Sequence, residues 1–87
     1  MNHAEIIAAA TEAAEIQGFT LAAIHAIPAL QAAMVLCIAP GEFPWAVHRF
    51  SGNSGALDEG EYFSTRETAL FQFNERLIYQ LCWAAAA

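Results

Sequence analysis

The sequence predicts a single small α+β domain, built as a three-stranded antiparallel meander with helices packed on one face. The expected order is α, short α, β, β, β, α. Three observations predict it. The chain has 87 residues, enough for one domain. A helix-capping pattern opens a helical segment near each end of the chain. Between these segments, short apolar runs are separated by turns rich in glycine and proline.

The first helix is predicted from about His3 to Gln17. Asn2 suits the N-cap position and Glu5 follows at the capping-box spacing, while Gly18 suits the end of a helix. The alanine-rich composition favours the helix and lets another element approach closely. The residues expected to face the core are Ile6, Ile7, Ala10 and Ala14.

The next segment is predicted to be a second, shorter helix over residues 21–27. Thr20 suits its N-cap, and Pro28 would end or kink it because proline has no amide proton and clashes with the preceding turn. Residues 21–39 carry no charge, so a membrane span is an alternative. The proline in the middle and the lack of flanking lysine or arginine argue against a span.

A β-hairpin is predicted next, with strands at about 33–39 and 45–50. The apolar run before Pro40 fits a helix or a strand, but Pro40-Gly41 suits a type II turn. The alternation of "WAVHRF" after that turn is typical of a strand, which favours the hairpin.

The pattern of residues 51–87 predicts a loop at 51–59, a short third strand in "GEYFS" and a final helix from about Thr65 to Trp83. Ser64 and Glu67 stand at the capping-box spacing ahead of an apolar period. That period consists of Leu70, Phe73, Leu77 and Leu81. The closing residues, Ala84 to Ala87, are interpreted as a cloning remnant or a frayed helix end.

Composition restricts the partners of this domain. Hydrophobic residues make up 57% of the chain, above the roughly 45–50% of typical domains, so surplus apolar surface favours self-association or docking on a partner. Nine acids face three arginines and no lysine, for a net charge of −6. Direct nucleic-acid binding is therefore not expected, because phosphate contacts need Lys or Arg. The negative electrostatic field of the protein attracts proteins that have basic surfaces.

The acidic residues are the candidate partner-binding site. Asp58, Glu59 and Glu61 stand within four positions in the glycine-rich loop and its edge. Carboxylates this close are stabilised when a partner's arginines share them in charge-assisted pairs. Further candidates are Glu42 in the hairpin loop and the helical stripe Glu5, Glu12 and Glu15. The alternative is that all of these charges only keep an apolar protein soluble.

No catalytic, cofactor or metal site is expected. The two cysteines, Cys37 and Cys82, lie in apolar runs, and we expect both to be buried thiols of a reducing compartment. The N-terminus lacks the features of a signal peptide, so a cytoplasmic location is expected. The aromatic residues are expected in the core by default; Tyr79 and Trp83 are the two for which exposure as an interface anchor is the alternative.

In size, charge and small α+β build, the chain resembles small anti-CRISPR proteins and other inhibitors encoded by phages and mobile elements. No motif carries this resemblance, so no functional residue is transferred through it. It implies a non-catalytic acidic module that docks on a basic nucleic-acid-binding surface of a CRISPR effector complex and blocks DNA binding. The alternative is a self-associating accessory subunit whose acids confer solubility, and the chain is expected to be a monomer or a homodimer.

Overall fold

The structure is a computed structural model that describes residues 1–86 of the chain. Helix α1 (His3–Ile16) is followed by four strands, and helix α2 (Arg66–Ala86) closes the chain. The strands are β1 (Thr20–Ile27), β2 (Ala32–Ile38), β3 (Trp45–Ser51) and β4 (Ala56–Phe63). They form one antiparallel sheet in sequence order, with β1 and β4 at its edges. The α+β class is confirmed, but the sheet has four strands where the sequence predicts three.

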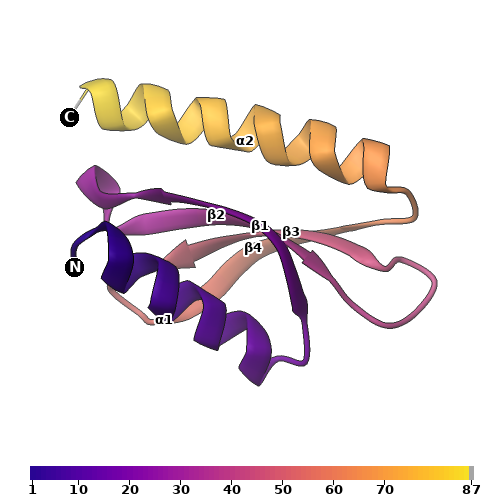
Figure 1. Cartoon of the computed structure of the whole chain (residues 1–87). Helices are drawn as coiled ribbons and strands as arrows, with labels where there is room; N and C mark the ends of the chain where they lie inside the picture. The colour runs from indigo at the N-terminus through magenta and orange to yellow at the C-terminus, as the bar shows by residue number, and fades with distance from the viewer. Residues whose placement is uncertain (87) are drawn as a thin grey trace.

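The two helices cover opposite faces of this sheet (Figure 1). Alternate residues of β2 point to opposite sides, as the pleat of a strand requires. Val35 and Cys37 belong to the core cluster that includes α1, whereas Met34 and Leu36 belong to the cluster that includes α2. The prediction that the helices pack on one face is therefore wrong. A continuous apolar run such as β2 is typical of a strand that is buried on both faces.

The predicted second helix is also wrong, because residues 20–27 form strand β1. This strand pairs along its length with β2, from Thr20 opposite Ile38 to Ile27 opposite Ala32. The connection is a single 3-10 turn, Pro28–Leu30, followed by Gln31 in the left-handed region at φ 50°. Neither helix within residues 1–86 combines the length and the apolar character needed to cross a bilayer.

Helix α1 begins as predicted. The side chain of Asn2 accepts a hydrogen bond from the Glu5 amide at 2.9 Å, and the Glu5 carboxylate accepts one from the Asn2 amide at 2.8 Å. This reciprocal capping box satisfies two amides that the helix leaves without partners. Of the residues expected to face the core, Ile6, Ala10 and Ala14 are buried.

The β2–β3 hairpin matches the prediction to within one residue at each end. Its turn is closed by a hydrogen bond from the Ala39 amide to the Pro44 carbonyl oxygen at 2.7 Å. Gly41 adopts φ +120° in this turn, a conformation that residues with a side chain rarely adopt. The last strand, by contrast, begins earlier than predicted, because β4 starts at Ala56 and takes in residues 56–59 of the predicted loop.

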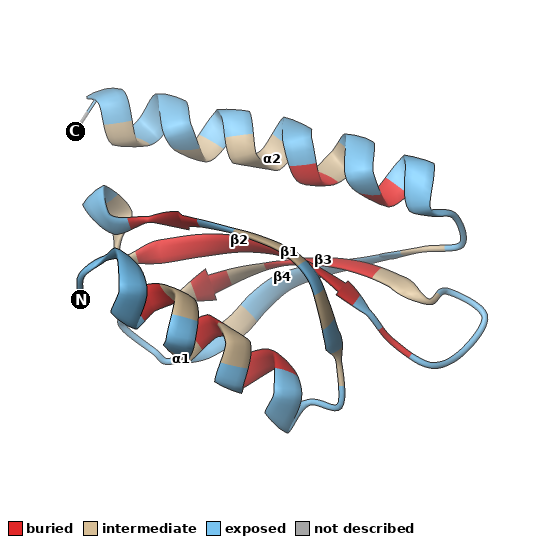
Figure 2. Cartoon of the chain, in the orientation of Figure 1, coloured by how far each residue is buried: buried red, intermediate tan, exposed pale blue. Residues whose placement is uncertain are grey.

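Helix α2 is the longest element but buries little. It begins one residue later than predicted, and Thr65 caps it by accepting a hydrogen bond from the Thr68 amide at 3.3 Å, where the sequence predicts a box between Ser64 and Glu67. Only Ala69 and Phe73 of its described residues are buried (Figure 2). Ala84 to Ala86 continue the helix, and Ala87 lies outside the described residues.

Candidate functional site

The acidic cluster Asp58, Glu59 and Glu61 lies on edge strand β4, where a β-bulge changes the pairing with β3. Val47 stands opposite Glu61 and Arg49 opposite Asp58, so β4 contains one extra residue at this point. Glu59 lies in the bulge and has φ 51°, in the left-handed region that few residues other than glycine adopt. The prediction that Asp58 and Glu59 occupy a loop is therefore wrong, because strand β4 positions them, whereas Glu61 lies in a strand as predicted.

Two of these acids are paired inside the protein. Arg76 of α2 lies 3.6 Å from Glu59 and 3.7 Å from Glu61, measured between guanidinium nitrogens and carboxylate oxygens. Its Nη1 atom also donates to the Val47 carbonyl oxygen at 3.3 Å. The Arg76 side chain is 18% exposed, whereas the two carboxylate side chains are 67% and 55% exposed. The two ion pairs of Arg76 therefore link α2 to β4 and partly neutralise the acidic cluster.

The bulge also holds the one buried polar side chain recorded in residues 1–86, His48 of β3. Its ring lies against Phe19, with centroids 5.3 Å apart, and edge-on to Tyr62, at 5.7 Å. A β-carbon placed on Gly60 would lie 2.7 Å from His48 Nδ1 and closer still to Cε1. The absence of a side chain at residue 60 is what lets the imidazole sit under β4.

Neither ring nitrogen of His48 has a hydrogen-bond partner within residues 1–86. Burial lowers the pKa of this imidazole, the positive charge of Arg76 lowers it further, and the carboxylate of Asp58 acts in the opposite direction. The ring is thus held neutral at physiological pH, in a site that does not solvate its charged form.

The structure does not gather the seven predicted acidic residues into one patch. Glu5 is engaged in the α1 capping box. Glu12 and Glu15 are exposed on α1, which covers the face opposite to α2 and Arg76, and Glu42 lies in the β2–β3 turn. The side chains of Glu12, Glu15, Glu42 and Asp58 make no hydrogen bond or ion pair with another described residue.

A different surface feature lies at the end of α2. The default prediction that the aromatic residues there lie in the core is wrong, and the alternative, exposure of Tyr79 and Trp83, is what the structure has. The outward side of the last turns of α2 exposes three large apolar side chains and one thiol, which we call the α2 patch: Ile78, Tyr79, Leu81 and Cys82. Ile78 and Tyr79 are each 61% exposed and Leu81 is 40% exposed. The next residue, Trp83, is 58% exposed and packs edge-on to Tyr79. An apolar hollow of about 250 Å³ lies among Tyr79, Cys82, Trp83 and Ala86.

The α2 patch could have been predicted from the lack of charged residues at the end of the last helix. No charged residue occurs from Leu77 to Ala86, although this is the end of a surface helix. A helix that is apolar around most of its circumference is normally buried on more than one side. Phe73 and Leu77 lie on the side of α2 that packs on the sheet, and the opposite side has no packing partner within residues 1–86.

The cysteines are both free, but only one is buried. Burial raises the pKa of the Cys37 thiol to about 11, which leaves it unreactive at neutral pH. Cys82 is exposed, contrary to the prediction. Cys37 forms no hydrogen bond with His48, and no group of three potential metal ligands occurs in the part of the chain that is described.

No protein-family model matches the chain, and comparison with curated proteins and with solved structures finds no significant match. The function is therefore inferred from the geometry of the bulge, the α2 patch and the distribution of charge.

Proposed function

We propose that the protein is a non-catalytic interaction module that self-associates, with a second copy of the chain covering the α2 patch. The observation that carries this proposal is the exposure of Ile78, Tyr79 and Leu81 on one side of a helix whose other side packs on the sheet. Contiguous exposed apolar side chains of this kind mark interaction surfaces. The apolar hollow beside Cys82 can receive a side chain from a partner.

Charge favours a second copy over other occupants of the patch. Residues 77–86 carry no charge, so they offer no carboxylate for ion pairs with a basic partner. They also offer no lysine or arginine for binding to an anionic lipid surface. A second copy brings the same uncharged surface. Its repulsive charge of −6 lies on other parts of the molecule and is screened over about 8 Å at physiological ionic strength.

Light scattering coupled to size-exclusion chromatography tests self-association. We expect a mass of twice the 9.4 kDa chain that falls on dilution, and we expect Ile78→Glu to shift the protein to a monomer. The matched control is Ile16→Glu, an equally large apolar residue that is 77% exposed at the end of α1 and should leave the dimer intact. A wild-type monomer at every concentration, or a dimer that survives Ile78→Glu, would refute the proposal. Binding of the wild-type monomer to neutral lipid vesicles would instead assign the patch to a membrane surface.

A second candidate function is the docking of the acidic surface on a basic partner, as in an anti-CRISPR-type inhibitor of a CRISPR effector complex in the host cytoplasm. It is favoured by the four acids, Glu12, Glu15, Glu42 and Asp58, whose side chains make no hydrogen bond or ion pair within residues 1–86; Glu12 and Glu15 lie on one helix. Glu59 and Glu61 are weaker candidates because Arg76 already pairs with both.

Binding to a purified effector complex, measured at increasing salt concentration, tests this second candidate. The double change Glu12→Gln and Glu15→Gln should weaken binding and reduce its salt dependence. Glu67→Gln on the first turn of α2 is the matched control and should not. Binding that is indifferent to salt and to both changes would exclude acidic docking.

A further inference from the structure

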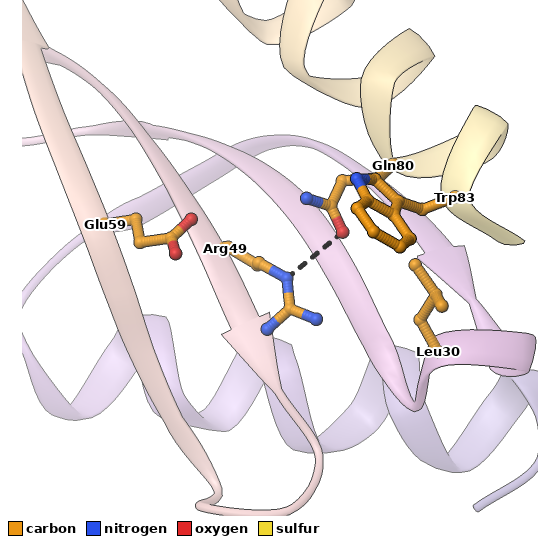
Figure 3. A pocket seen from close by; sticks show the side chains of 5 residues that line it. All are labelled: Leu30, Arg49, Glu59, Gln80 and Trp83. Atoms are coloured by element: carbon orange, nitrogen blue, oxygen red, sulfur yellow. Dashed lines mark hydrogen bonds between the residues drawn. The ribbon is translucent and has the colours of Figure 1, made fainter.

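A second surface feature lies on the opposite side of Trp83 from the α2 patch and does not depend on self-association. It is an open groove of about 300 Å³ between the last turns of α2 and the sheet. Its lining residues are Leu30, Arg49, Glu59, Gln80 and Trp83 (Figure 3). This volume is at the lower end of the range found for small-molecule sites.

Arg49 is the unusual residue in this groove. It is half-buried, and its Nε atom donates to Gln80 Oε1 at 3.2 Å. No carboxylate lies within 4.0 Å of its guanidinium among residues 1–86, although Asp58 is its register partner on β4 and Glu59 lines the same groove. Arg76, one helix turn before Gln80, is paired with two carboxylates. In a chain with nine acids, Arg49 thus keeps its two Nη groups available for an external acceptor.

The neighbouring groups restrict which anion fits. Gln80 Oε1 accepts from Arg49 Nε, so Gln80 occupies the Nε side of the guanidinium and the two Nη groups at its end remain for a ligand. Glu59 on the groove wall and the net charge of −6 oppose a dianion such as phosphate. The indole of Trp83 and the side chain of Leu30 form an apolar wall at one end (Figure 3). The combination suits a single negative charge attached to an apolar body.

We infer that this groove binds a small monocarboxylate with an aromatic or aliphatic body. The carboxylate would form a bidentate pair with the Nη groups of Arg49, and the apolar body would lie on Trp83 and Leu30. Arginine is suited to this role because its planar fork matches the two oxygens of a carboxylate.

Titration with 3-phenylpropionate, followed by nuclear magnetic resonance, tests the inference. We expect saturable shifts of the Arg49 Nε–H and Trp83 indole N–H signals. The neutral analogue 3-phenylpropionamide should bind at least about tenfold more weakly, because it cannot form the charged pair. Arg49→Gln should weaken binding of the acid by a similar factor.

The control is Arg66→Gln, which removes an arginine at the start of α2, roughly 25 Å along the helix from Trp83. It should leave the affinity unchanged. Each variant is first checked for native circular dichroism, and Arg49→Lys serves as a second variant that keeps the charge and removes the fork. Equal affinity for the acid and the amide, unchanged affinity in a folded Arg49→Gln, or no saturable shift would each overturn the inference. Because Ile78→Glu lies outside the groove, loss of the dimer in that variant should not alter these shifts.

Discussion

The imidazole of His48 occupies the space that a side chain at residue 60 would need, so the β-bulge of β4 and the buried histidine of β3 depend on each other. Glu59 and Gly60 together make this possible. Glu59 adopts the left-handed conformation that accompanies the extra residue, and Gly60 then lies next to the ring with no side chain to collide with it. As a result, the acidic edge strand β4 packs against the neutral, buried imidazole of His48.

Gly60→Ala should destabilise the fold by about 1–3 kcal/mol, because overpacking forces either the ring or the strand to move. Residue 60 is not among the glycines with positive φ, so the cost comes from the contact and not from the backbone. Urea denaturation measures the change. In the double variant Gly60→Ala with His48→Ala, the cost of the alanine at 60 should largely disappear, whereas additive costs would show that the two residues are independent.

The stability of the protein should fall as the pH drops below about 6.5, the ordinary pKa of histidine. The pKa of His48 is lowered in the folded state, mainly by burial and further by Arg76, while Asp58 opposes the shift. The unfolded chain therefore binds the proton first, so the contribution of His48 is complete above this pH. It is lost on acidification towards the lower folded pKa, at up to about 1.4 kcal/mol per pH unit.

Urea midpoints at pH 7.5 and pH 5.5 measure this dependence. In His48→Phe, which keeps an aromatic ring but cannot take up a proton, the difference between the two midpoints should shrink. The comparison concerns the pH dependence and not the absolute stability, because the larger ring changes packing under Gly60. An unchanged pH dependence in the variant would assign the effect to other groups.

Arg76→Gln should reduce the free energy of unfolding by about 1 kcal/mol. Most of this loss comes from the hydrogen bond to the Val47 carbonyl oxygen, because ion pairs with exposed carboxylates such as Glu59 and Glu61 contribute little. Arg66→Gln, at the exposed start of the same helix, is the control and should change stability by less than about 0.5 kcal/mol. Equal effects of the two variants in urea denaturation would show that Arg76 does not anchor α2.

Alkylation should distinguish the two cysteines. At pH 8, iodoacetamide should modify Cys82 and leave Cys37 free until the chain is unfolded, because a thiol with a pKa of about 11 is ionised in only about one molecule in a thousand. Mass spectrometry counts the labels on each peptide. Rapid labelling of Cys37 in the native protein would contradict its burial. Slower labelling of Cys82 at high protein concentration would agree with a second copy on the α2 patch.

Features that depend on residues close together in the sequence could be predicted from the sequence alone. The Asn2–Glu5 capping box, the turn at Pro40-Gly41 and the starts of both helices to within one residue follow from local hydrogen bonding and backbone preferences. The net charge and the lack of lysine also come from composition alone.

The contacts of the acidic cluster could not be predicted from local sequence, because they involve residues that are distant in the chain. Its residues could be picked out as neighbours in sequence, but their pairing with Arg76 joins positions that are fifteen or more residues apart. The same is true of Gly60, whose importance depends on a ring from the adjacent strand.

By itself, the sequence determined where the helices begin, where the hairpin turns and how the charges are distributed, since each of these depends on residues close together in the chain. Only the tertiary structure decided that residues 20–27 are a strand, that the helices lie on opposite faces of the sheet and that one side of α2 is left uncovered. "LAAIHAI" suits a helix and a strand almost equally, and pairing with β2 settles the choice. Burial of β2 on both faces then requires a helix on each side, and each helix can bury only the side that meets the sheet.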